Sequence, residues 1–177
     1  MADPDSADAL VAVLLDLDRH VGRDGWDQPP RLFALVLNDV LAEAEPTLSR
    51  QMGLRTTRSG GLPGALTAIE QDEFRSSGDL TRDLATLEWP ETVFGCALAT
   101  VRTFLPAAYE ADLPAEPQAA AAAVAAHPQR QEIRVVVGAD RAGNCHGVGR
   151  LASRPEKVLG APDLVPGLAS ALAHTLC

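Results

Sequence analysis

The sequence contains a single lysine, Lys157, beside fourteen arginines. A P-loop needs a lysine directly after its last glycine, and a Schiff-base enzyme needs a desolvated lysine. Lys157 lies in the charged stretch "RPEKVLG" (residues 154–160), away from any phosphate-binding loop. The sequence therefore argues against both kinds of lysine chemistry.

Metal and nucleophile motifs are also missing. The four histidines are scattered without H-x-x-x-H or H-E-x-x-H spacing, and the chain has neither C-x-x-C nor G-x-S-x-G. The carboxylates of "EQDE" (residues 70–73) could hold a hard cation, but acidic strand ends of this kind are usually only solvated. We therefore predict no metal, no cofactor and no catalytic residue.

Three cysteines, Cys96, Cys145 and Cys177, make an odd count without the spacing of a disulfide framework. The N-terminal "MADPDSADAL" lacks the basic region of a signal peptide. Charged residues interrupt the apolar stretches well short of a membrane span. We therefore expect a cytoplasmic protein with no membrane partner.

Acidic residues outnumber basic residues by 24 to 15, which gives a formal net charge of −9. An acidic surface repels a phosphate backbone, so we expect no nucleic-acid partner. The length of 177 residues and the ordinary apolar content of 46% suit one globular domain over residues 1–177.

Hydrophobic periodicity and turn residues divide the chain into alternating helices and strands. Helices are expected at 6–22, at 39–45 with a continuation to 53, within 76–90, in the alanine-rich stretch 115–131 and at 161–176. Within 76–90, Asp79 is expected to cap the helix and Pro90 to end it. The first helix has one apolar stripe, formed by Leu10, Val13, Leu14, Leu17 and Val21. Strands are expected at 31–38, near 65–71, at 92–105, and in a hairpin formed by 132–138 and 145–153. The glycine-rich residues 53–64 form the clearest loop.

The closing hairpin requires antiparallel pairing, whereas the earlier alternation of helices and strands also permits a mixed sheet. We predict a single α+β domain with a five-stranded, largely antiparallel sheet and helices packed mainly on one face, with a mixed α/β sheet as the alternative. Residues 92–105 are apolar at both the odd and the even positions, so both faces of this strand are apolar. With helices on one face of the sheet, the other apolar face is expected to lie uncovered by helices. This favours a homodimer.

The stretch "AGNCHGVGRLAS" (residues 142–153) combines two apparent motifs. Cys145 beside His146 suggests a thiol with its base, and the glycines Gly147 and Gly149 match the G-x-G-x-x-A spacing of a dinucleotide-binding turn. In a strand, however, neighbouring side chains point to opposite faces, and no helix pattern follows the glycines. We therefore interpret the stretch as a β-strand with a structural cysteine.

Two tryptophans, Trp26 and Trp89, lie in proline-flanked junctions that lead into predicted strands. A tryptophan at such a junction usually closes the end of a core, but its apolar area and single donor also suit a ligand or partner pocket. Nearby arginines and carboxylates could supply polar contacts. The candidate binding residues are Trp26, Arg31, Glu70, Glu88, Trp89 and Arg102.

Four segments, "GWDQPPRLFALV", "EWPETVFGCAL", "HPQRQEIRVVVG" and "GAPDLVPGLASALAHTL", resemble an uncharacterised family of small actinobacterial proteins. The resemblance spans nearly the whole chain. Similar sequences have C-A-L-R-L where this chain has "CHGVGRL", which makes Cys145 an ordinary strand position and His146 peculiar to this chain. The family has no established activity, so the resemblance implies an intracellular actinobacterial source and transfers no catalytic residue.

The lack of catalytic motifs leads us to expect a non-catalytic cytoplasmic module that binds a partner protein or a small ligand, comparable by fold analogy with secretion-chaperone-like scaffolds. The alternative is a small-molecule enzyme with a carboxylate and arginine pocket near Trp26 and Trp89. In such a pocket Glu70, Asp72 or Glu88 would have a perturbed pKa. A third interpretation is a structural subunit that only assembles.

Overall fold

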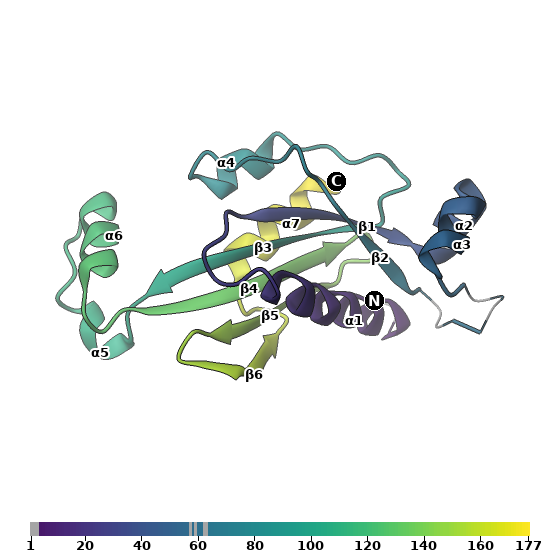
Figure 1. The fold of residues 1–177 in the computed structure, drawn as a ribbon. Helices are drawn as coiled ribbons and strands as arrows, with labels where there is room; N and C mark the ends of the chain where they lie inside the picture. Colours follow the sequence, from purple (N-terminus) through teal and green to yellow (C-terminus); the bar gives the residue numbers. More distant parts are fainter. Residues whose placement is uncertain (1–3, 57, 59, 62–63) are drawn as a thin grey trace.

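Residues 4–56, 58, 60–61 and 64–177 are described by a computed structural model of the chain (Figure 1). The strands are β1 (Arg31–Leu37), β2 (Leu66–Glu70), β3 (Gly95–Phe104), β4 (Gln131–Asp140), β5 (Cys145–Leu151) and β6 (Arg154–Ala161). The helices are α1 (Pro4–Gly22), α2 (Asn38–Ala44), α3 (Pro46–Met52), α4 (Leu80–Ala85), α5 (Ala107–Glu110), α6 (Pro117–Ala126) and α7 (Pro166–Thr175). Of the predicted loop at 53–64, residues 57, 59, 62 and 63 lie outside the described residues.

The strands form a six-stranded sheet in the order β2-β1-β3-β4-β5-β6, and every neighbouring pair is antiparallel. This confirms the α+β class, and the mixed-sheet alternative is wrong. The prediction of five strands is also wrong, because the sequence of β6 has the character of a charged loop. β6 is an edge strand with mostly exposed side chains, where a sheet tolerates Pro155 and its missing N–H.

Helices cover both faces of the sheet, so the prediction that they pack mainly on one face is wrong (Figure 1). On one face lies the apolar stripe of α1, predicted from its spacing: Leu10, Val13, Leu14, Leu17 and Val21. On the other face, α4 and α7 bury Leu84, Leu168 and Leu172 against the opposite alternation of the strands. β3 is apolar on both alternations for this reason. Among the described residues, the uncovered face on which the homodimer prediction rested does not exist.

Capping residues set the ends of the short helices. Asp79 accepts a hydrogen bond from the backbone N–H of Arg82 at 3.1 Å, so α4 starts at Leu80 as the sequence predicts. Pro46 lies in the first turn of α3, where its missing N–H is not needed. Gly53 ends α3 with a φ of 67°, a left-handed conformation that favours glycine.

β3 and β4 extend beyond the other strands and carry α5 and α6 at their far end (Figure 1). Residues 106–130, which include both helices, are termed the arm. No residue of α6 is buried, as expected for a helix of alanines that can bury little apolar area. No helix of the described part of the chain has both the length and the apolar character needed to cross a membrane.

Candidate functional site

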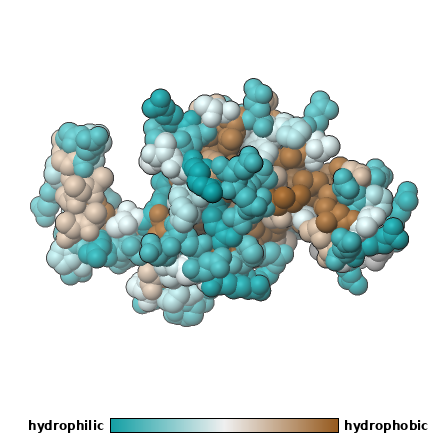
Figure 2. All heavy atoms as spheres, turned by 45° about the horizontal axis from the view of Figure 1, so that its top comes forward, coloured by the Kyte–Doolittle hydropathy of each residue, from teal (hydrophilic) through white to brown (hydrophobic). Residues whose placement is uncertain are grey.

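A cleft of about 1410 Å³ lies between the arm and the body of the domain. Its walls are the loop before β1, the segment from Glu70 to α4, the outer part of β3 and the start of α6. From α6, the lining residues are Pro117, Gln118 and Ala121. Figure 2 shows the arm standing apart from the body, so the cleft is open to solvent.

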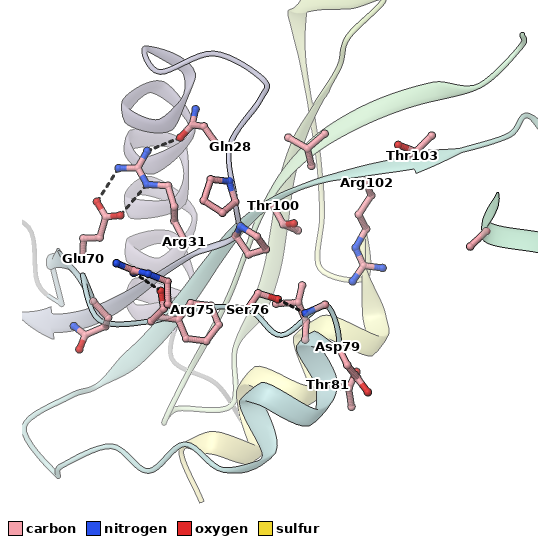
Figure 3. Close-up of a pocket in the computed structure, with 18 of the residues that line it drawn as sticks. Gln28, Arg31, Glu70, Arg75, Ser76, Asp79, Thr81, Thr100, Arg102 and Thr103 are labelled. Atoms are coloured by element: carbon pink, nitrogen blue, oxygen red, sulfur yellow. Dashed lines mark hydrogen bonds and ion pairs between the residues drawn. The ribbon is translucent and has the colours of Figure 1, made fainter. Parts of the chain in front are cut away.

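Arg31 closes one end of the cleft with a network of hydrogen bonds (Figure 3). Its Nε and Nη2 donate to the two carboxylate oxygens of Glu70 at 2.8 and 2.7 Å. Its Nη1 donates to the carboxylate of Asp24 and to the side-chain carbonyl of Gln28, each at 2.9 Å. The bidentate pair fixes both geometry and charge. Arg31 therefore clamps the loop before β1 to the edge strand β2.

The clamp also sets the protonation of its members. The hydrogen bonds from Arg31 lower the pKa of the Glu70 carboxyl, and the same contact raises the pKa of the Arg31 guanidinium. A general acid at neutral pH needs the opposite shift of its carboxyl pKa. Glu70 is therefore held as an ion-paired carboxylate.

Two further arginines of the cleft, Arg75 and Arg102, form no ion pair within the described residues. Arg75 donates to the backbone carbonyls of Asp72 and Phe74 at 2.6 and 2.8 Å. Arg102 is exposed and points from β3 into the cleft (Figure 3). Hydroxyl groups add donors and acceptors to the walls, from Ser76, Thr81, Thr100 and Thr103. The cleft thus offers cationic and hydrogen-bonding groups to a ligand, beside the exposed carboxylates of Asp72 and Asp79.

Three of the six candidate residues predicted from the sequence line this cleft: Arg31, Glu70 and Arg102. The other three, Trp26, Glu88 and Trp89, lie elsewhere. The two tryptophans pack over opposite faces of the sheet, so they do not share the pocket that the enzyme alternative requires.

Trp26 covers a buried ionic cluster beneath α1. Its ring stacks on the guanidinium of Arg134, with 4.7 Å between the guanidinium carbon and the ring centroid. The Asp18 carboxylate, whose side chain is 1% exposed, accepts a hydrogen bond from Arg150 Nε at 2.7 Å and lies 3.7 Å from Arg134 Nη2. Trp26 therefore closes the α1 side of the core, the usual role of a tryptophan at a junction.

Trp89 closes the opposite side of the core. Its Nε1 donates to Thr175 Oγ1 at 2.9 Å, and its ring packs against the cluster beneath α7. Glu88 is exposed and lines, with Trp89, a separate pocket of about 460 Å³. Neither residue contributes to the cleft.

Cys145 and His146 lie on opposite faces of β5, which confirms that they form no dyad with each other. Cys145 packs towards α7, whereas His146 is paired with Gly138 on the face covered by α1. Burial raises the pKa of the Cys145 thiol and lowers the pKa of the His146 imidazole. Both shifts favour the neutral forms, unlike the charged pair of a reactive thiolate. Gly147 and Gly149 are interior residues of the same strand.

The model of one protein family matches residues 10–177, and that family is described as PPA1309-like protein. The chain belongs to the PPA1309-like protein family. This match confirms the family resemblance seen in the sequence. No curated protein and no solved structure matches the chain. Family membership therefore attaches no ligand or reaction to the cleft of this PPA1309-like protein.

No three metal-ligating side chains come together within the described residues. In the acidic stretch at 70–73, Glu70 is held by Arg31, while Asp72 and Glu73 are exposed. The geometry therefore gives no support to a cation site at this strand end.

Apart from Arg102, the sequence interpretation missed the outer part of β3 as part of a site. Residues 100–104 look like a plain continuation of a strand, and the Pro29–Pro30 pair looks like a simple break. A diproline directly before a strand, however, prevents that strand from extending backwards along its neighbour. Because β3 is longer than β1, the part of β3 beyond the start of β1 has no strand partner on that side in the described residues.

Proposed function

We propose that the protein is a non-catalytic binding module and that the cleft between the arm and the body is its binding site. The observation that carries the proposal is the cleft itself, which is open, measures about 1410 Å³, and contains two arginines without ion-pair partners in the described residues, Arg75 and Arg102. Pockets for small molecules typically measure roughly 300–1,000 Å³. The larger volume and the open form favour a partner protein over a small ligand.

The charged groups of the cleft support binding rather than proton transfer. Arg31 and Glu70 neutralise each other, and their pKa shifts hold both in the charged form. Such a fixed pair shapes a surface but neither gives nor takes a proton at neutral pH. No specific observation favours the enzyme alternative, because Glu88 and the tryptophans lie on other surfaces.

A cytoplasmic location remains part of this proposal. All three cysteines are free, and Cys96 is buried against α7, which suits a reducing compartment. The homodimer stays a prediction, and the part of the chain that the structure describes has no uncovered sheet face to support it.

The test fills the cleft without altering the body of the domain. Ala121 of α6 lines the cleft, and Ala122 beside it is exposed but does not line the cleft. Wild type, Ala121→Trp and Ala122→Trp serve as baits in a lysate of the native host, and captured proteins are identified by mass spectrometry. We expect a partner that wild type and Ala122→Trp retain and that Ala121→Trp loses. Capture of no specific partner, or of the same partners by all three baits, would contradict the proposal.

A further inference from the structure

β3 has an open edge where it runs past the start of β1. β1 pairs with β3 only as far as Arg31, which lies opposite Ala99. β3 continues to Phe104, and over this outer part it is paired with β4 alone. In the described residues, positions 101–104 of β3 therefore have a strand on one side only.

The hydrogen-bond alternation identifies the backbone groups on this edge. The carbonyl of Phe94, just before β3, accepts a hydrogen bond from the N–H of Arg141, just after β4. Residues of an antiparallel strand bond alternately to its two neighbours, so the even-numbered residues of β3 bond to β4. The N–H and C=O groups of Val101 and Thr103 consequently point away from β4, towards the position that β1 leaves free.

Pro29 and Pro30 keep that position free. In the register that places Arg31 opposite Ala99, residue 29 would be the next hydrogen-bonding partner of Val101. Proline has no N–H to donate and a fixed φ, so Pro29 cannot form this pair. Both prolines instead line the cleft.

The open edge lies inside the cleft rather than on a flat surface. Lining residues come from both sides of the sheet: Gln28 and Arg31 from the side of α1, and Phe74 and Leu80 from the side of α4. The cleft therefore wraps around the edge of β3, with α6 at its far end. Such a recess admits a single extended chain along the strand.

Arg102 indicates the charge of that chain. Its side chain lies on the face covered by α7, and its cross-strand neighbour on β4 is the apolar Ile133. The residue directly opposite Arg102 on an added strand would lie on the same face, where an opposite charge is favourable. The residues opposite Val101 and Thr103 would lie on the other face, beside β-branched side chains that favour β-branched neighbours.

We propose that the cleft binds an extended segment of a partner protein, which adds as a strand to residues 101–103 of β3 and places a carboxylate opposite Arg102. Main-chain hydrogen bonds to Val101 and Thr103 would hold the segment, and the alternation of β-branched and acidic residues would select it. The inference rests on the proposed function and specifies the chemistry of the partner.

A second copy of this chain fits the edge less well. Two β3 edges related by a two-fold axis, with Val101 of each copy paired to Thr103 of the other, would set the two Arg102 side chains directly opposite each other. Like charges in this position are destabilising. The recess also hinders the approach of a whole second sheet.

The experiment uses synthetic hexapeptides of alternating valine and glutamate, with binding to the full chain measured by fluorescence anisotropy. Valines would lie opposite Val101 and Thr103, so N-methylation of the valine amides removes the donors that face β3. We expect this change to weaken binding about tenfold or more, because two main-chain hydrogen bonds are lost. N-methylation of the glutamate amides, which face away from β3, serves as the matched control and should have little effect.

A second hexapeptide, in which lysine replaces each glutamate, and two charge-reversal variants of the protein test the role of charge. Wild type should prefer the glutamate peptide by about tenfold, since an attractive cross-strand pair replaces a repulsive one. Arg102→Glu should reverse this preference, whereas Arg154→Glu on the exposed edge strand β6 should not.

Equal binding after N-methylation of the valine amides overturns strand addition, and equal binding of the lysine peptide overturns the acidic partner. The glutamate peptide could fail to bind even at millimolar concentration while the lysate experiment still finds a partner that Ala121→Trp loses. That combination overturns this inference and leaves the proposed function standing. Capture that is insensitive to Ala121→Trp would instead contradict the proposed function.

Discussion

Asp18→Asn should destabilise the fold strongly, because it removes the anion from a buried cluster of two arginines. The Asp18 side chain is 1% exposed, and those of Arg134 and Arg150 are 9% and 20% exposed. Asparagine keeps the shape and removes the charge. Loss of one partner from a buried ion pair costs about 3–5 kcal/mol, and the partial exposure of Arg150 favours the lower end, about 3 kcal/mol. For a domain of this size, the midpoint of thermal unfolding should then fall by roughly 6–12 °C.

The assay is urea unfolding followed by tryptophan fluorescence, to which Trp26 contributes from its position on Arg134. The midpoint urea concentration should fall. The slope of the unfolding free energy against urea concentration should stay unchanged, because unfolding exposes the same surface. Asp16→Asn is the matched control on α1, because the Asp16 side chain is 70% exposed and its ion pair with Arg19 lies at the surface. Equal effects of the two substitutions would refute the reasoning.

The remaining predictions concern the clamp, the thiols and the diproline. Denaturation at a series of pH values should show wild type more stable than Glu70→Gln. The difference in unfolding free energy should be complete above the ordinary carboxyl pKa of 4.5, and it should be lost as the pH falls through the lowered pKa of folded Glu70. A constant difference at all pH values would contradict the ion pair. Iodoacetamide at neutral pH should label exposed Cys177 before Cys96, whose thiol pKa burial raises to about 11, as read by mass spectrometry; early labelling of Cys96 would count against its burial. The double substitution Pro29→Val and Pro30→Thr should let β1 extend along β3, so that the valine–glutamate peptide loses affinity in the anisotropy assay; unchanged affinity would mean that the prolines do not keep the edge open.

The sequence predicts those parts of the fold that depend on local patterns. The apolar stripe of α1, the Asp79 cap of α4 and the antiparallel hairpin that places Cys145 in a strand all follow from spacing and capping residues. β6 escapes this reasoning, because an exposed edge strand with a proline carries no apolar alternation. The two apolar alternations of β3 reveal that both faces are buried, but they do not distinguish a covering helix from a second chain.

The site depends on strand order, which no local pattern contains. Arg31 and Glu70 meet because β1 pairs with β2, although 39 residues separate them in the chain. Arg102 reaches the same cleft because β3 lies on the other side of β1 and extends beyond the start of β1. Sequence proximity instead suggested Trp26 and Trp89, which close opposite sides of the core.

Amide hydrogen exchange along β3 in the free protein, measured by NMR, tests the central claim most directly. The account predicts slow exchange for the amides of Thr100 and Arg102, which bond to β4, and fast exchange for those of Val101 and Thr103, which face the open edge. The four residues belong to one strand, so each pair is the control for the other. Exchange of Val101 and Thr103 as slow as that of Thr100 and Arg102 would show that the edge is already occupied, and would contradict a cleft built to receive a strand.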